Sequence, residues 1–199
     1  MRRLLSLLFT FVTVLLLAEV CPAQGERAVY GYNLNGEPVT SLASSGVAAV
    51  VLFFAATDCP LSNRYLPEIR RIEQKFYSRH IVVWIVYPNF GETSVGVKQH
   101  EAAYGVEDHV LLDPNHQLVA LAHAKVTPES AVLIPETADA KMFRTVYHGR
   151  VDDRYLRLGL EKPIAAQHDL ERAIEAALQK RAVEQPGGPA VGCGIIGRP

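Results

Sequence analysis

A buried strand that passes directly into a helix is the feature that most constrains this sequence. The continuous apolar run from Val47 to Ala56 is typical of a strand covered on both faces. It stops at Thr57-Asp58-Cys59-Pro60, and apolar residues then recur at helical spacing from Leu61 to Tyr77. Pro60 suits the first turn of a helix, where a missing N–H costs nothing. Pro67 falls inside the pattern and predicts a kink or a break.

Strands and helices alternate along the rest of the chain. Further strands are expected at 81–87, 110–112, 130–134 and 142–147, and further helices at 93–104, 116–124 and 165–181. Asn35-Gly36 predicts a tight turn between two short strands near the N-terminus. The alternation predicts an α/β fold with a mainly parallel central sheet, in which strands 130–134 and 142–147 are close enough in sequence to pair antiparallel.

The first 23 residues have the pattern of a signal peptide. Arg2-Arg3 forms a basic start, Leu4 to Ala18 is apolar but short for a membrane span, and Cys21-Pro22-Ala23 offers small residues for cleavage after Ala23. The mature chain is therefore expected to be exported, either periplasmic or secreted, without stable membrane insertion after cleavage. An uncleaved signal would anchor the protein in a membrane, and a lipoprotein acylated on Cys21 is a further alternative.

The remaining composition predicts one globular domain, expected over residues 24–182, followed by an irregular Pro/Gly-rich tail over 183–199. The net charge of −1 gives no reason to expect a nucleic acid as partner. His116 and His123 are seven residues apart and could share a helix face, but without a close ligand spacing no metal site is expected. Asp152-Asp153-Arg154 predicts a solvated turn with local charge pairing rather than a substrate clamp.

Cysteine usage makes Cys59 the candidate reactive residue. If Cys21 leaves with the signal, only Cys59 and Cys193 remain, and exported thiols either pair or carry redox chemistry. At the start of a helix, the sulfur of Cys59 would face free N–H groups and the positive end of the helix dipole, which lower a thiol pKa. Asp58 would oppose this effect and Arg64 would offset it. A structural cysteine packed at a helix start is the alternative.

These motifs, in their order, resemble the thioredoxin superfamily, and most closely its redoxin group, which includes the AhpC/TSA proteins and the exported TlpA/ResA-like thioredoxins. The resembling segments are Val50-Ala56 leading into Thr57-Asp58-Cys59-Pro60-Leu61-Ser62, Val110-Leu-Leu-Asp-Pro114, Val126-Thr127-Pro128 and Tyr147-His-Gly-Arg150. The resemblance covers about residues 29–181. It implies a three-layer sandwich with a central mixed sheet flanked by helices. It also implies that Cys59 is catalytic and that Pro128, preceded by Thr127, is a cis proline beside it.

The sequence also departs from these relatives. Ser62 stands where thioredoxins have their second cysteine, so it cannot resolve a mixed disulfide, and Cys193 on the tail is the possible resolving thiol. A Cys193 without a role, or one that pairs between chains, stays open. Thr57 stands one residue too close to the cysteine for the peroxiredoxin pattern. Asn63 occupies the second cysteine position of the Sco-type copper chaperones.

The sequence therefore predicts an exported thiol-disulfide oxidoreductase that uses Cys59 as nucleophile and Cys193 as possible resolving thiol. Its partners would be protein thiols or disulfides and an upstream thiol reductant, with no organic cofactor. One alternative is a thiol-dependent peroxidase with antioxidant activity, in which a peroxide oxidises Cys59 to sulfenic acid. Another is a non-catalytic redoxin-like module for binding or metal handling. The sequence indicates neither the oligomeric state nor the direction of electron flow.

Overall fold

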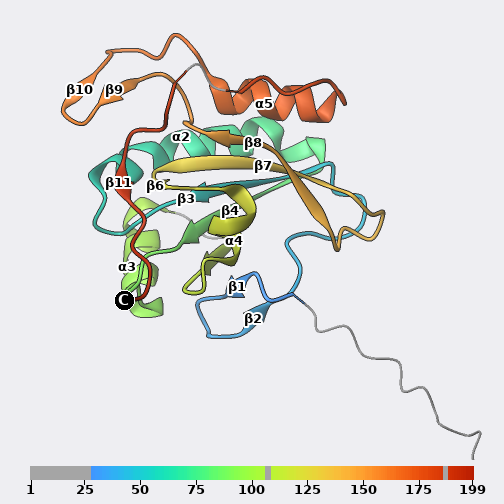
Figure 1. Cartoon of the computed structure of the whole chain (residues 1–199), viewed down its shortest axis with the longest axis horizontal. Coiled ribbons are helices and arrows are strands. Elements are labelled where there is room, and N and C mark those ends of the chain that lie inside the picture. Colours follow the sequence, from blue (N-terminus) through green and yellow to red (C-terminus); the bar gives the residue numbers. More distant parts are fainter. Residues whose placement is uncertain (1–27, 106–108, 186–187) are drawn as a thin grey trace, which may run out of the picture.

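The computed structural model describes residues 28–105, 109–185 and 188–199, and a seven-stranded mixed sheet forms their centre (Figure 1). The strands are, in sheet order, β2 (Pro38–Val39), β1 (Gly31–Tyr32), β5 (Val110–Leu112), β4 (Ile81–Tyr87), β3 (Ala49–Phe54), β7 (Glu129–Pro135) and β8 (Phe143–Gly149). The three central strands β3, β4 and β5 run parallel, whereas β7 and β8 form the expected antiparallel pair. The predicted mixed sheet with a parallel centre is confirmed.

Helices cover both faces of this sheet and complete three layers. They are α2 (Pro60–Phe76), continued by the 3-10 turn η1 (Tyr77–Arg79), α3 (Ser94–Tyr104), α4 (Gln117–Ala122) and α5 (Asp169–Leu178). Side chains of β3 point alternately to the two faces, as the period of two in a strand requires. Val51 and Phe53 pack in one core with α2, α3 and α5, whereas Leu52 and Phe54 pack in the other with α4. The strand that precedes Cys59 is therefore buried on both sides, as predicted.

Two predicted helices differ from the observed ones. α2 runs unbroken from Pro60 to Phe76, so the predicted break at Pro67 is wrong: this proline lies on the exposed face, while the apolar face holds the helix on the sheet. α5 begins at Asp169 rather than near residue 165. The backbone N–H groups of Ala166 and Gln167 donate to the carboxylate of Asp153, which keeps this segment outside the helix.

The tail beyond residue 182 is more ordered than its composition predicts. Cys193–Gly194 forms strand β11, which pairs antiparallel with β6 (Val126–Thr127). Ile196 adds two hydrogen bonds with residues 89 and 90, in the loop after β4. The prediction of an irregular tail is thus wrong at Cys193–Gly194, where backbone groups of β6 are available for pairing, whereas residues 195–199 have no regular secondary structure. Figure 1 shows the tail passing beside β6 towards α3.

A small hairpin stands at the same end of the molecule as β11. Its strands are β9 (Tyr155–Arg157) and β10 (Leu160–Glu161), joined at a glycine with positive φ, Gly159. Among the described residues, no helix is long and apolar enough to cross a membrane. The expected signal peptide, its cleavage after Ala23 and the residue Cys21 lie outside the described residues.

Candidate redox site

Cys59 occupies the junction between β3 and α2. It is the residue immediately before the helix, with extended backbone angles (φ −91°, ψ 110°), and Pro60 is the first helical residue. Its carbonyl accepts the N–H of Asn63, which begins the helical hydrogen bonding. The side chain of Cys59 is 0% exposed. The local sequence therefore places a thiol at the N-terminal end of a long helix and beneath other parts of the chain.

The tail brings the second cysteine to this thiol. The sulfur of Cys193 lies 2.9 Å from the sulfur of Cys59, although the two residues are 134 positions apart in the sequence. In β11, Cys193 pairs with Thr127 of β6. The tail approaches this closely because Gly192 lacks a side chain: a Cβ there would lie 2.2 Å from the carbonyl oxygen of Thr127. Both cysteines are free thiols in this structure.

The loop before β7 forms the third part of the site. The peptide bond between Thr127 and Pro128 is cis, and the thiol of Cys59 donates to the carbonyl of Thr127 at 3.0 Å. The buried carboxylate of Glu129 accepts the N–H groups of Lys125 and Val126, and so fixes the shape of the loop. The structure therefore brings Cys59, Cys193, Thr127 and Pro128 together.

The surroundings of the two thiols give them unequal acidity. Burial alone would raise the pKa of Cys59, but hydrogen bonds from Cys193 and from the N–H and hydroxyl of Ser62 outweigh it, and the pKa lies below that of an ordinary thiol. The donation to Cys59 raises the pKa of Cys193 to about 11, with further contributions from burial and from the charges of Cys59 and Asp58. Cys59 is therefore favoured as the thiolate and Cys193 as the protonated thiol.

Of the residues predicted to support Cys59, some lie near its sulfur and others contact different groups. Ser62 is fully buried, and its hydroxyl also accepts the N–H of Ala56. Asp58 is exposed and acts on Cys193. The predicted role of Arg64 in lowering the pKa of Cys59 is wrong, because its guanidinium pairs with Glu161 at 3.0 Å and Ser62 and Cys193 supply the stabilising donors instead. Pro60 starts the helix.

Sequence reasoning missed three residues that shape this site. Glu92 accepts both the N–H and the hydroxyl of Thr57, and Glu129 organises the loop before β7. The contact of Glu92 with Thr57 spans 35 positions and depends on the folded chain, whereas Glu129 bonds residues only three and four positions before it. Gly192 did carry a signal, since a glycine directly before a cysteine is a position where backbones can approach closely.

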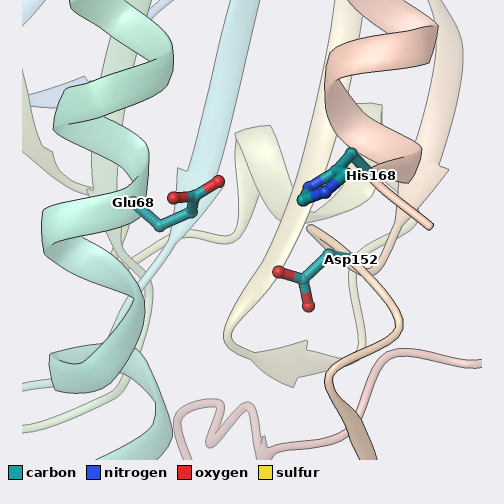
Figure 2. A group of neighbouring side chains, drawn as sticks. All are labelled: Glu68, Asp152 and His168. Atoms are coloured by element: carbon teal, nitrogen blue, oxygen red, sulfur yellow. The ribbon is translucent and has the colours of Figure 1, made fainter. Parts of the chain in front are cut away.

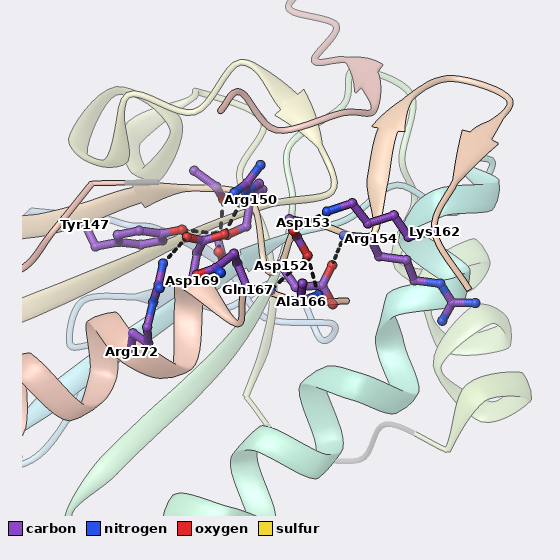
Figure 3. Close-up of polar contacts among 12 residues, drawn as sticks. Tyr147, Arg150, Asp152, Asp153, Arg154, Lys162, Ala166, Gln167, Asp169 and Arg172 are labelled. Atoms are coloured by element: carbon purple, nitrogen blue, oxygen red, sulfur yellow. Dashed lines mark hydrogen bonds and ion pairs between the residues drawn. The ribbon is translucent and has the colours of Figure 1, made fainter. Parts of the chain in front are cut away.

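The two aspartates of the turn after β8 are buried, so the predicted solvation is wrong, whereas the predicted local charge pairing is present. Figure 3 shows the polar contacts of this turn. Asp152 accepts the hydroxyl of Tyr65 and the N–H of Arg154. Asp153 pairs with Lys162 and accepts two backbone N–H groups of the segment before α5. These carboxylates join α2, the β9–β10 hairpin and the segment leading into α5, and they have a structural role.

Among the residues that the structure describes, one group of side chains has ligand atoms close enough for a metal ion. Glu68 on α2, Asp152 after β8 and His168 before α5 point towards one another, with ligand atoms within 4.8 Å (Figure 2). Glu68 is already paired with Arg71 through both oxygens, and Asp152 with Tyr65. A cation there would have to compete with these partners.

The two histidines whose spacing would allow them to share a helix face lie instead at opposite ends of α4. His116 and His123 flank α4 as its N-cap and C-cap residues, both with left-handed backbone conformation. The ring of His116 bonds the carbonyl of Pro88, and the ring of His123 packs edge-on against His148. Each ring therefore has its own separate surroundings.

Comparison with known proteins supports the fold. No protein-family model matches the chain, and no curated protein matches its sequence. An uncharacterized conserved protein from Geobacillus kaustophilus is similar in structure, with a TM-score of 0.69 and 19% identity over 87% of this chain and 91% of that one. A hypothetical protein from Sinorhizobium meliloti 1021 has a TM-score of 0.69 and 22% identity over 86% and 92% of the two chains.

A third similar structure is described as a thioredoxin. A proposed thioredoxin from Neisseria meningitidis is similar with a TM-score of 0.50 and 17% identity, over 79% of this chain and 93% of that chain. At these identities the likeness concerns the fold alone. Together with the mixed sheet and the helices on both faces, it shows that this chain has a thioredoxin-like fold.

Proposed function

We propose that this protein is an exported thiol-disulfide oxidoreductase in which Cys59 is the nucleophile and Cys193 is the resolving thiol. The observation that carries the proposal is the 2.9 Å contact between the two sulfurs. Two further features support it: the lowered pKa of Cys59 and the position of Thr127-Pro128 beside it. The thiolate is the attacking species in disulfide exchange, so a low thiol pKa at the helix start favours this chemistry.

In the proposed reaction the Cys59 thiolate attacks one sulfur of a partner disulfide. The partner's S–S bond breaks, its other sulfur leaves as a thiolate, and a mixed disulfide forms on Cys59. Cys193 then gives up its proton and attacks the sulfur of Cys59, which releases the partner's second thiol. The partner gains two electrons and two protons, and the protein ends as the Cys59–Cys193 disulfide. An upstream thiol reductant would restore the two thiols.

The docked tail sets one condition on this cycle. Because Cys59 is 0% exposed beneath its neighbours, a partner protein reaches it only after the tail has moved aside. Hydrogen peroxide is small enough to need less displacement, and this favours the thiol peroxidase as the second candidate. Against the peroxidase, the hydroxyl of Thr57 donates to Glu92 and is therefore not free to position a peroxide.

The test is to measure insulin disulfide reduction and peroxide consumption, each with dithiothreitol as electron source. We expect the wild-type protein to accelerate disulfide reduction, the Cys59→Ser variant to lose this activity, and the Cys193→Ser variant to accumulate mixed disulfide on Cys59. Ser41→Ala, an exposed change away from the cysteines, is the matched control. Peroxide consumption that outpaces disulfide exchange would favour the peroxidase. Full activity in Cys59→Ser would refute a catalytic role for this thiol.

A further inference from the structure

The two sulfurs of the site differ in the access they give to an incoming thiol. We propose that the reductant of the Cys59–Cys193 disulfide attacks the sulfur of Cys193, and that it arrives through the groove between the β9–β10 hairpin and the start of α2. This inference rests on the proposed function, because it concerns the disulfide formed there. It assigns the site of attack and the partner segment: an extended stretch of a protein dithiol with an apolar residue beside its cysteine.

Burial separates the two possible targets of attack. Cys59 is 0% exposed, whereas Cys193 is only half-buried. Nucleophilic displacement at a disulfide requires that the incoming thiolate reach the sulfur it attacks. The accessibility of each sulfur therefore strongly affects the rate of attack on it. Residues 192–196, termed the strap, lie against Cys59, and Cys193 in this strap contacts Cys59 while remaining partly exposed.

The outward side of Cys193 opens into a groove of about 360 Å³. The groove is lined by Cys193, by the first turn of α2 and by the β9–β10 hairpin. Its apolar and aromatic lining residues are Pro60, Leu61, Tyr155, Leu158 and Leu160. Leu158 is 61% exposed and Leu160 is 42% exposed, so both are available for contact with a partner. The Arg64–Glu161 ion pair stands at the same groove. A thiol presented next to an apolar side chain fits this arrangement, because Cys193 and the leucines line one cavity.

The chemistry of the leaving group favours the same direction of attack. The incoming thiolate forms a bond to the sulfur of Cys193, the S–S bond breaks, and Cys59 departs with the electron pair as a thiolate. A stabilised thiolate is the better leaving group, and the N–H and hydroxyl of Ser62 remain as hydrogen-bond donors that stabilise Cys59 as a thiolate. The second thiol of the reductant then attacks the reductant's own sulfur and releases Cys193, which takes up a proton. Two electrons pass from the dithiol to the protein.

The experiment maps the first adduct with glutathione as the probe. The protein is oxidised to the Cys59–Cys193 disulfide, mixed briefly with reduced glutathione, quenched with acid, alkylated with N-ethylmaleimide and analysed by peptide mass mapping. We expect glutathione on Cys193 and maleimide on Cys59 in at least about tenfold excess over the reverse pattern at the earliest times. In 6 M guanidinium chloride the excess should fall to about threefold or less, because burial no longer distinguishes the sulfurs.

The outcomes of this experiment distinguish a failure of the inference from a failure of the proposed function. Glutathione found first on Cys59, or evenly on both cysteines, overturns the inference while the proposed function stands. An equal bias in guanidinium overturns it as well, since burial would then not be the cause. If no disulfide joins the two cysteines on oxidation, the proposed function itself fails and the inference with it.

The groove is tested separately with a protein reductant. We expect Leu158→Ser combined with Leu160→Ser to slow reduction by a purified thioredoxin about fivefold or more and to leave reduction by dithiothreitol unchanged. Leu156→Ser is the matched control, because Leu156 belongs to the same hairpin and is 53% exposed but does not line the groove. An equal effect of the control, or no effect of the double variant, overturns the assignment of the groove.

Discussion

The close approach of Gly192 to the loop before β7 allows a sharp test of how the tail is held. In Gly192→Ala the new Cβ would lie 2.2 Å from the carbonyl oxygen of Thr127, 2.6 Å from its carbonyl carbon and 3.0 Å from the nitrogen of Pro128. All three are backbone atoms, so no flexible side chain can move aside. A normal carbon–oxygen contact is longer than the first of these distances by about 1 Å, and the tail must therefore lift by roughly this amount.

We expect such a shift to move the sulfur of Cys193 away from that of Cys59 without unfolding the domain. β11 pairs with β6 over only two residues, and each hydrogen bond contributes about 1 kcal/mol net. The strap lies outside the seven-stranded sheet, so the apolar cores keep their contacts. We expect the rate of Cys59–Cys193 disulfide formation with one equivalent of oxidant to fall about tenfold or more, and alkylation of Cys59 by iodoacetamide to rise by a similar factor. The melting temperature should change by no more than about 2 °C.

Gly194→Ala is the matched control for this substitution. It places the same methyl group two residues further along the same strap, where a Cβ would meet no atom within 4 Å. The control should form the disulfide at the wild-type rate and should shield Cys59 as the wild type does. If Gly192→Ala behaves like Gly194→Ala in both assays, the close backbone contact does not hold the tail, and the reasoning is refuted.

Three further predictions concern acidity and stability. Ser62→Ala removes one donor to the sulfur of Cys59, so the pKa of Cys59 should rise and the pH profile of its alkylation should move to higher pH; an unchanged profile would contradict this. Cys193→Ala removes a second donor and should shift the same profile in the same direction, whereas Cys193→Ser, which retains a donor, should shift it less. Tyr65→Phe leaves buried Asp152 without its hydroxyl donor and should lower the free energy of unfolding by about 1–3 kcal/mol in urea titrations, with insulin reduction retained per folded molecule.

The regular part of the fold was predictable because its signals are local. A run of apolar residues with no polar face indicates a strand buried on both sides, and β3 and β4 have this pattern. The cap of α3 could also be predicted, since the side chain of Thr93 accepts the N–H of Gly96, only three residues away. Hydrophobic periodicity and helix capping depend on residues close together in the sequence, so these elements can be predicted without knowledge of the folded chain.

The errors arose where distant segments decide the local structure. Asp153 accepts N–H groups 13 and 14 residues further along the chain, and this contact both buries the acidic turn and delays the start of α5. The pairing of β6 with β11 joins a segment that precedes α5 in the sequence with one that follows it. Neither segment has the sequence pattern of a strand by itself. Within the site, the position of Cys59 followed from the local pattern, but the contact of its sulfur with Cys193 depends on this pairing.

The two sulfurs belong to parts of the molecule that should differ greatly in hydrogen exchange. Cys59 closely follows β3, whose side chains are buried in both cores, so we expect the β3 amides to exchange only when the whole domain unfolds. Cys193 is held by a short bridge and a few neighbouring hydrogen bonds. Forming the proposed disulfide between the two cysteines should raise the protection of residues 192–196 and leave that of β3 unchanged. The redox state of the protein would thus be readable from the exchange of a few tail amides.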